Sequence, residues 1–177
     1  MGCGKSSVGR RLSELLCCPF MDLDEEIEAR AGRSIPEIFA EDGEDAFRKM
    51  ELETLYDIVP MPVYSRGPLP ADESSQDIIL ALGGGTVMTR ECAEIVHKGT
   101  ICIYLKASVE TLVSHLEGET ENRPMLQGES LRERISELMA RRSGTYEGTA
   151  HVIIDTDGRS IDEIALEIIS KVRQSGV

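Results

Sequence analysis

MGCGKSS, residues 1–7, is the stretch that decides which fold the rest of the chain predicts. Gly4-Lys5-Ser6 matches the end of the phosphate-binding pattern GxxxxGKS/T, in which glycines let backbone N–H groups point at phosphate oxygens. In that pattern the lysine reaches the outer phosphates of a nucleotide, and the hydroxyl binds Mg²⁺ at the positive end of the next helix. The same tripeptide also occurs by chance at an ordinary glycine-rich helix start, so residues further along must decide.

Length and composition predict one globular domain. The chain has 177 residues, of which 41% are hydrophobic and 29% charged, which suits a single domain with its own core. The net charge of −13 argues against nucleic acid and membrane surfaces as partners, because both attract basic proteins. No apolar run is long enough for a membrane span or a signal sequence, so we expect a cytoplasmic protein. The cysteines and histidines show no metal-ligand or disulfide spacing.

Apolar runs alternate with helical patterns along the chain, which predicts an α/β protein with a mostly parallel sheet. Strands are expected at residues 20–24, 77–82, 100–105 and 151–155. Helices are expected at residues 6–16, 44–58, 90–97, 108–117, 130–142 and 161–172, and capping boxes start at Ser34, Ser130 and Ser160. Residues 60–76 are rich in proline and serine and are expected to form a loop.

Polar and glycine residues follow the ends of two predicted strands, where ligands bind in α/β sheets. Asp22 and Asp24 end the first of these strands, and an i, i+2 pair in a strand shares one face. Alternatively, the two aspartates form a turn or a helix N-cap. Gly83, Gly84 and Gly85 follow the second strand and indicate either close approach of the backbone to a ligand or a tight turn.

Two arginines are candidate anion-binding groups, because the guanidinium fork matches a planar carboxylate. Arg48 lies in an acidic predicted helix, where a solvated ion pair is the alternative. Arg142 lies near a predicted helix C-terminus, where a positive charge is favourable in any case.

Six motifs in unbroken order make the chain resemble the shikimate kinases: GCGKSSVGRRL, FMDLDEEIE, GRSIPEIFAEDGEDAFRKME, LALGGGTV, NRPMLQG and MARRSGTY. The resemblance implies a P-loop kinase of the nucleoside-monophosphate-kinase type, an α/β fold of three αβα layers with a parallel sheet of order 2-3-1-4-5. It implies transfer of the γ-phosphoryl group of ATP to the 3-hydroxyl of shikimate in chorismate biosynthesis, with Mg²⁺ as cofactor.

The resemblance also implies a role for each matching residue. Lys5 would hold the transferring phosphoryl group, Asp24 would orient the substrate hydroxyls and accept the proton, and Arg123 would neutralise phosphate charge. The residues implied for the ATP phosphates are Gly2, Cys3, Gly4, Lys5, Ser6, Ser7 and Arg123. Those implied for shikimate are Asp24, Arg48, Gly83, Gly84, Gly85 and Arg142, with both arginines on its carboxylate. Mg²⁺ would bind Ser6 directly and Asp22 through water.

The implied organisation is one kinase domain over residues 1–177, acting as a monomer on small-molecule substrates. It would contain a substrate-binding subdomain at 24–59, a surface insertion at 60–76 and a lid at 118–128. His115 and Leu116 stand near the place of an arginine that faces adenine in the family.

The loop pattern places its first glycine, and the family's first strand, before Met1. We therefore expect Met1 to be an internal methionine and the functional protein to start about ten residues earlier. As written, the chain is expected to fold poorly or bind nucleotide weakly, because a central strand shares hydrogen bonds with two neighbours.

Two other functions stay open from the sequence. A kinase of the same fold could act on another small hydroxylated acid, such as gluconate. A non-catalytic module could bind the ligand without turnover. The paired arginines favour a carboxylate on a rigid ring over the first of these alternatives.

Overall fold

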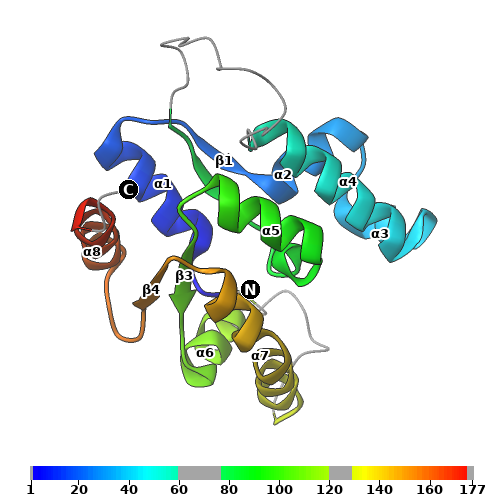
Figure 1. Cartoon of the computed structure of the whole chain (residues 1–177). Coiled ribbons are helices and arrows are strands. Elements are labelled where there is room, and N and C mark those ends of the chain that lie inside the picture. Colours follow the sequence, from blue (N-terminus) through cyan, green and yellow to red (C-terminus); the bar gives the residue numbers. More distant parts are fainter. Residues whose placement is uncertain (1, 60–76, 120–128, 175–177) are drawn as a thin grey trace, which may run out of the picture. The chain divides into compact units, whose positions relative to one another are not determined.

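The computed structural model describes residues 2–59, 77–119 and 129–174, and Figure 1 traces the chain. The chain divides into two compact units: unit 1 contains Met1–Val8 and Ile101–Val177, and unit 2 contains Gly9–Thr100. The predicted insertion at 60–76 and most of the predicted lid, including Arg123, lie outside the described residues. Within the described segments, no helix has the length and apolar character needed to cross a membrane.

Unit 2 contains one parallel strand pair and most of the helices in the first half of the chain. Strand β1 (Phe20–Asp22) pairs with β2 (Ile79–Ala81), with Phe20 opposite Ile79 and Asp22 opposite Ala81. Its helices are α2 (Leu23–Ala31), α3 (Ile35–Glu41), α4 (Gly43–Ile58), the short 3-10 turn η1 (Thr86–Met88) and α5 (Arg90–Gly99) (Figure 1). Its buried apolar side chains include Leu23, Ile27, Ile38, Phe47, Leu55, Cys92, Ile95 and Val96.

Local signals in the sequence explain how α3 and α4 form. The backbone N–H of Ser34 donates to the Glu37 carboxylate at 2.8 Å, which confirms the capping box that opens α3. Gly43, the first residue of α4, has a φ of +83°, a left-handed conformation that favours glycine and turns the chain from α3 into α4. The Phe39 and Phe47 rings then lie 4.8 Å apart between the two helices, which fixes the start of α4.

Unit 1 contains the second parallel pair, β3 (Ile103–Lys106) and β4 (Val152–Asp155). Its helices are α6 (Val109–Glu119), α7 (Glu129–Thr149) and α8 (Ile161–Gln174), and α1 (Lys5–Leu16) begins in unit 1 and ends in unit 2. Burial alternates along β4, and α8 packs against this strand with Ile164, Ala165 and Ile168 buried. This alternation is the period-2 pattern of a strand with one face in the core.

The α/β class and the parallel pairing are confirmed by the structure. When β1 to β4 are taken as the family's second to fifth strands, both observed pairs are neighbours in the order 2-3-1-4-5. The single-domain organisation and the subdomain at 24–59 stay predictions.

Most of the expected boundaries shift by one to three residues, and two differences change the interpretation. The strand expected at 20–24 ends at Asp22, and Asp24 lies in α2, a helix that the sequence pattern did not predict. The end of α7 lies at Thr149 rather than at residue 142. The Tyr146 ring, packed 5.2 Å from Tyr104 of β3, gives this last part of α7 a tertiary contact that outweighs the low helix propensity of its glycines.

Candidate active site

The phosphate loop, residues 2–7, has the backbone shape that the sequence pattern predicts. Gly2 and Gly4 have φ angles of +69° and +75°, which favour glycine because other side chains are strained there. The Gly4 carbonyl accepts from the Val8 N–H at 2.9 Å, so the helical bonding of α1 starts at the loop itself. The loop therefore leads directly into the N-terminus of α1, where the backbone N–H groups and the helix dipole favour an anion.

The N-terminus of α1 carries no compensating negative charge of its own. Its first turn contains no acidic residue, whereas α2, α4 and α8 each begin with two or more carboxylates. Lys5 is half-buried there, and Ser6 and Ser7 are exposed. The positive end of the helix dipole and the Lys5 ammonium thus suit a phosphate group as their counter-charge.

Helix α6 supports the phosphate loop. His115 Nδ1 donates to the Gly2 carbonyl at 2.7 Å, and Nδ1 must carry the proton because a carbonyl oxygen can only accept. A Cβ on Gly2 would lie 3.1 Å from Cγ of Leu116, so the loop backbone packs closely on this helix. Cys3 packs against a buried cluster formed by Ala107, Leu112, Leu131 and Ile135. His115 and Leu116 thus hold the loop in place.

Asp22 and Asp24 in unit 2 have different positions rather than a shared strand face. Asp22 ends β1 and caps α2, because its Oδ1 accepts from the Asp24 N–H at 3.1 Å. The prediction of two carboxylates on one strand face is therefore wrong, and the N-cap alternative is confirmed. The Asp24 carboxylate lies against the glycine turn: a Cβ on Gly83 would be 2.7 Å from its Oδ1.

Arg48 lies on the same glycine turn, on α4 of unit 2. A Cβ on Gly85 would be 2.7 Å from Nη2 of Arg48, so a side chain at this position would displace the guanidinium from where it lies. Arg48 donates from Nη1 to Glu51 at 2.8 Å and from Nη2 to Glu44 at 3.2 Å, and it lies 5.2 Å from the Phe47 ring centre. With 26% of its side chain exposed, Arg48 is a partly buried cation held in place and still reached by solvent.

Glu51 on α4 and Thr86, which follows the three glycines, are two polar residues to which the sequence analysis assigned no role. The Glu51 side chain is 1% exposed, and it accepts from Arg48 and, at 2.6 Å, from the Thr86 hydroxyl. Burial by itself lowers the pKa of Arg48, but the hydrogen bond and charge of Glu51, followed by those of Glu44, hold that pKa above its ordinary value. A signal was present in the sequence: Glu51 lies four residues from both Phe47 and Leu55, on the apolar face of α4.

The structure thus brings together one part of the predicted site in each unit. Unit 2 gathers Asp24 and Arg48 on the turn that contains Gly83, Gly84 and Gly85. Unit 1 holds the phosphate loop and carries Arg142, half-buried on α7. We call Arg48, Glu51, Gly85 and Thr86 the arginine cradle.

The two residues predicted for Mg²⁺, Ser6 in unit 1 and Asp22 in unit 2, carry oxygen atoms of the kind that this ion binds. Ser6 offers a hydroxyl and Asp22 a carboxylate, and Mg²⁺ commonly takes one or two protein oxygens together with substrate phosphates and water. Among residues 2–59, 77–119 and 129–174 there is no cluster of three or more His, Cys, Asp or Glu side chains that could hold a metal. The residue types at these two positions therefore fit Mg²⁺.

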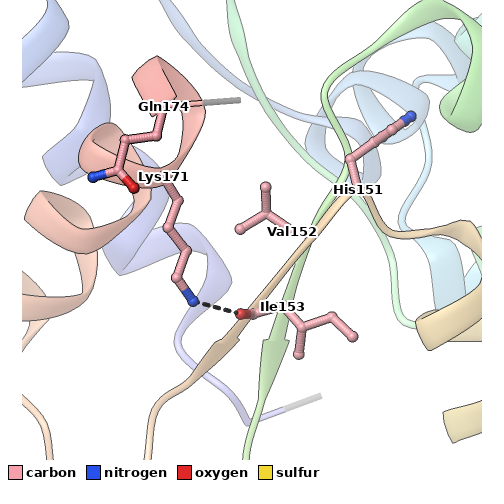
Figure 2. A pocket seen from close by; sticks show the side chains of 5 residues that line it. All are labelled: His151, Val152, Ile153, Lys171 and Gln174. Carbon is pink, nitrogen blue, oxygen red and sulfur yellow. Dashed lines mark hydrogen bonds between the residues drawn. The ribbon is translucent and has the colours of Figure 1, made fainter. Parts of the chain in front are cut away.

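A shallow pocket of about 320 Å³ lies elsewhere in unit 1, between β4 and α8 (Figure 2). Its lining consists of His151, Val152, Ile153, Lys171 and Gln174. Lys171 donates to the Ile153 carbonyl at 3.3 Å and pairs with Glu167 at 2.9 Å, while His151 Nδ1 accepts from the Cys102 N–H at 3.0 Å. None of the predicted site residues lines it, and its polar groups make structural contacts.

Comparison with known proteins agrees with the motif order. The model of the family described as shikimate kinase matches residues 1–68 and 69–173. A shikimate kinase of Dictyoglomus turgidum is 39% identical over 175 residues, covering 98% of this chain and 93% of that protein. A shikimate kinase of Thermus thermophilus is 38% identical over 97% of this chain and 85% of that protein.

Solved structures give the same family. A shikimate kinase of Acinetobacter baumannii in complex with shikimate superposes with a TM-score of 0.81 and 31% identity, over 99% of this chain and 89% of that one. The crystal structure of shikimate kinase from Aquifex aeolicus gives a TM-score of 0.75 and 27% identity, over 99% and 93% of the two chains. The protein described here has the P-loop kinase fold and belongs to the shikimate kinase family.

Proposed function

We propose that this chain transfers the γ-phosphoryl group of ATP to the 3-hydroxyl of shikimate, giving shikimate 3-phosphate and ADP. The observation that carries the proposal is the arginine cradle with Asp24 beside it on one glycine turn. An arginine fork suits a carboxylate, and an aspartate suits hydroxyl groups, so the pair matches a small hydroxylated acid. The relative from Acinetobacter baumannii, solved in complex with shikimate, supports shikimate as that acid.

In the proposed reaction each residue binds, orients or moves a proton. Arg48, together with Arg142, binds the substrate carboxylate, and the glycine turn lets the substrate approach the backbone closely. Asp24 accepts a hydrogen bond from the attacking hydroxyl and takes its proton as the phosphorus–oxygen bond forms. The phosphate loop and Lys5 hold the phosphates, and Arg123 neutralises charge on them.

Bound Mg²⁺ would neutralise phosphate charge, with Ser6 and Asp22 as its protein-side oxygens. Positioning and charge neutralisation are the main demands of phosphoryl transfer, since the protein makes no covalent bond to the group transferred. The metal, the monomeric state and the cytoplasmic location belong to this proposal and stay predictions.

A coupled ADP-release assay with shikimate tests the proposal directly. We expect ADP release with shikimate and little with gluconate, and loss of turnover in Asp24→Asn. The assay should be run on this chain and on a form extended by the upstream codons. Preference for gluconate would favour a kinase of the same fold with another substrate. If both forms bind shikimate without releasing ADP, the chain is a non-catalytic module.

A further inference from the structure

The arginine cradle is organised around a buried carboxylate that two different elements hold. Thr86 Oγ1 donates to Oε1 of Glu51 at 2.6 Å, and Arg48 Nη1 donates to Oε2 at 2.8 Å. The first donor belongs to η1 and the second to α4, the helix that also carries Glu51. With one partner on each oxygen, the plane of the Glu51 carboxylate is fixed from both sides.

The hydrogen bond between Thr86 and Glu51 is buried, so its loss should be costly. Thr86 is 0% exposed and Glu51 1% exposed, so water cannot replace a lost hydrogen bond without rearrangement. Thr86 also belongs to the glycine turn: its N–H donates to the Gly83 carbonyl at 3.2 Å, and a Cβ on Gly83 would lie 3.1 Å from its hydroxyl. The same residue thus closes the turn with its backbone and reaches α4 with its side chain.

Arg48 also contacts a second carboxylate, Glu44. The hydrogen bond to Glu51 is therefore the one that keeps the guanidinium in one orientation. Glu44 receives Nη2 at 3.2 Å and is 66% exposed, so this contact is weak and easily exchanged. Glu51 is buried and holds Nη1, whereas the exposed Glu44 on Nη2 is the partner that an incoming anion can replace. If Glu51 could rotate, Arg48 would lose its fixed direction, and binding would have to restore that order at an entropic cost.

We propose that Thr86 is a positioning residue for the substrate carboxylate, because its hydroxyl orients Glu51 and Glu51 orients Arg48. This inference rests on the proposed function for the identity of the anion, but the contact network itself lies wholly within unit 2. Thr86 does not touch the reacting atoms. It determines how firmly Arg48 is held in its binding orientation before the substrate binds.

Two substitutions at one position test the proposal. Thr86→Val keeps the shape and removes the hydroxyl, whereas Thr86→Ser keeps the hydroxyl. We expect Thr86→Val to raise the KM and Kd for shikimate about five- to tenfold, with kcat and the KM for ATP within about twofold. Thr86→Ser should stay within about twofold of the parent in every constant. Equal behaviour of the two variants, or an unchanged shikimate Kd in a folded Thr86→Val protein, would overturn the proposal.

A matched control separates positioning from general loss of stability. Thr54 is also buried, at 3% exposed, on the same helix α4, but it is not a member of the arginine cradle. Thr54→Val should therefore leave the shikimate Kd unchanged even if its melting temperature falls. A double-mutant cycle with Glu51→Leu, which removes both acceptor oxygens, adds a second check: the effect of Thr86→Val should disappear in that background, and additive effects would contradict action through Glu51.

A readout without substrate keeps this proposal distinct from the proposed function. The Arg48 side-chain Nε–H signal in NMR reports how firmly the guanidinium is held. We expect faster solvent exchange of this proton in Thr86→Val than in the parent and Thr86→Ser. If the parent releases no ADP with shikimate, the proposed function fails while this measurement still decides the role of Thr86. Identical exchange in all three proteins would reject it.

Discussion

The phosphate loop of unit 1 and the arginine cradle of unit 2 are prepared for anions by different means. The loop uses backbone: glycines with positive φ angles lead straight into the N-terminus of α1, whose first turn contains no acidic residue. The cradle uses side chains: a buried carboxylate holds an arginine so close to Gly85 that a Cβ there would displace the guanidinium. Backbone N–H groups are fixed once the chain has folded, whereas a long arginine side chain needs further contacts to keep one direction.

The difference predicts how each region responds to substitution. In the loop, the donors are main-chain groups, and the side chain that adds most is the Lys5 charge. In the cradle, no single group acts alone, because Arg48, Glu51 and Thr86 depend on one another. Substitutions in the loop should therefore act on nucleotide chemistry, and those in the cradle on affinity for the acid.

Lys5→Ala should give the largest effect. Removing a cation that stabilises charge on the transferring phosphoryl group is expected to lower kcat by roughly 10²–10³-fold, as for the loss of one preorganised donor. The Kd for shikimate, measured by calorimetry without nucleotide, should stay within about twofold. Lys49→Ala is the control, because Lys49 is 77% exposed and lies 3.9 Å from its partner Glu53. An equal fall in shikimate affinity would erase the distinction between the two regions.

Arg48→Ala should come next and act on the other substrate. Losing a charged hydrogen-bond pair costs roughly 1.5–3 kcal/mol, which is one to two decades in shikimate affinity. The Kd for ATP should change little. Arg90→Ala serves as the control, since Arg90 is 88% exposed and pairs with Glu94 along one helix. If ATP affinity fell as much as shikimate affinity, the assignment of Arg48 to the carboxylate would be wrong.

The same contrast explains how much the sequence could predict. The loop is encoded locally, in consecutive residues, so Gly4-Lys5-Ser6 points to it directly, and the motifs further along the chain then decide against a chance match. Glycines at 83–85 were identified for the same reason. The alternation of strands and helices predicted a mostly parallel sheet, and the pairing of β1 with β2 and of β3 with β4 agrees with the strand order that the resemblance implies.

The cradle partners could not be predicted in the same way, because they meet only after folding. Thr86 and Glu51 are 35 residues apart, and nothing in the spacing of one points to the other. The end of β1 was missed for a local reason: an Asp-Leu-Asp sequence fits both a strand and an N-cap, and the bond from the Asp24 N–H to Asp22 decides for the cap. A side-chain hydrogen bond decides both the pairing of Thr86 with Glu51 and the end of β1 at Asp22.

Gly85→Ala tests the steric basis of the cradle. The added Cβ would lie 2.7 Å from Nη2 and 3.2 Å from Cζ of Arg48, so the guanidinium must move away from the turn. The φ of Gly85 is −102°, which alanine adopts, so backbone strain should not contribute to the effect. Overpacking of this kind costs about 1–2 kcal/mol, so we expect a five- to thirtyfold rise in the shikimate KM.

Gly144→Ala is the matched control for this substitution. Gly144 lies inside α7 with open space where a Cβ would be placed, so alanine should leave the KM unchanged and stabilise the helix by about 1 kcal/mol. An equal rise in KM for both variants would show that glycine flexibility, rather than room for Arg48, is what matters.

The smallest expected effect is that of low pH on helix α6, which supports the phosphate loop. Asp157 accepts from the Ser108 N–H at 2.9 Å at the start of α6, the helix whose His115 holds Gly2. The backbone hydrogen bond from Ser108, followed by that from the Thr111 side chain, lowers the pKa of Asp157 below its ordinary value. A carboxylate with a lowered folded pKa stabilises the protein above its unfolded pKa, and this contribution is lost as pH falls through the folded value.

The measurement is the melting temperature of the parent and of Asp157→Asn between about pH 7 and pH 3. Asp157 is exposed, so the parent should melt only about 1–3 °C higher at neutral pH, and the two curves should converge in acid. The other lowered carboxylates are common to both proteins and cancel in the difference. A gap that stays constant down to pH 3 would mean that the Asp157 charge does not anchor α6. The difference in ADP affinity between the two proteins should also shrink in acid, because the phosphate loop depends on α6 for its position.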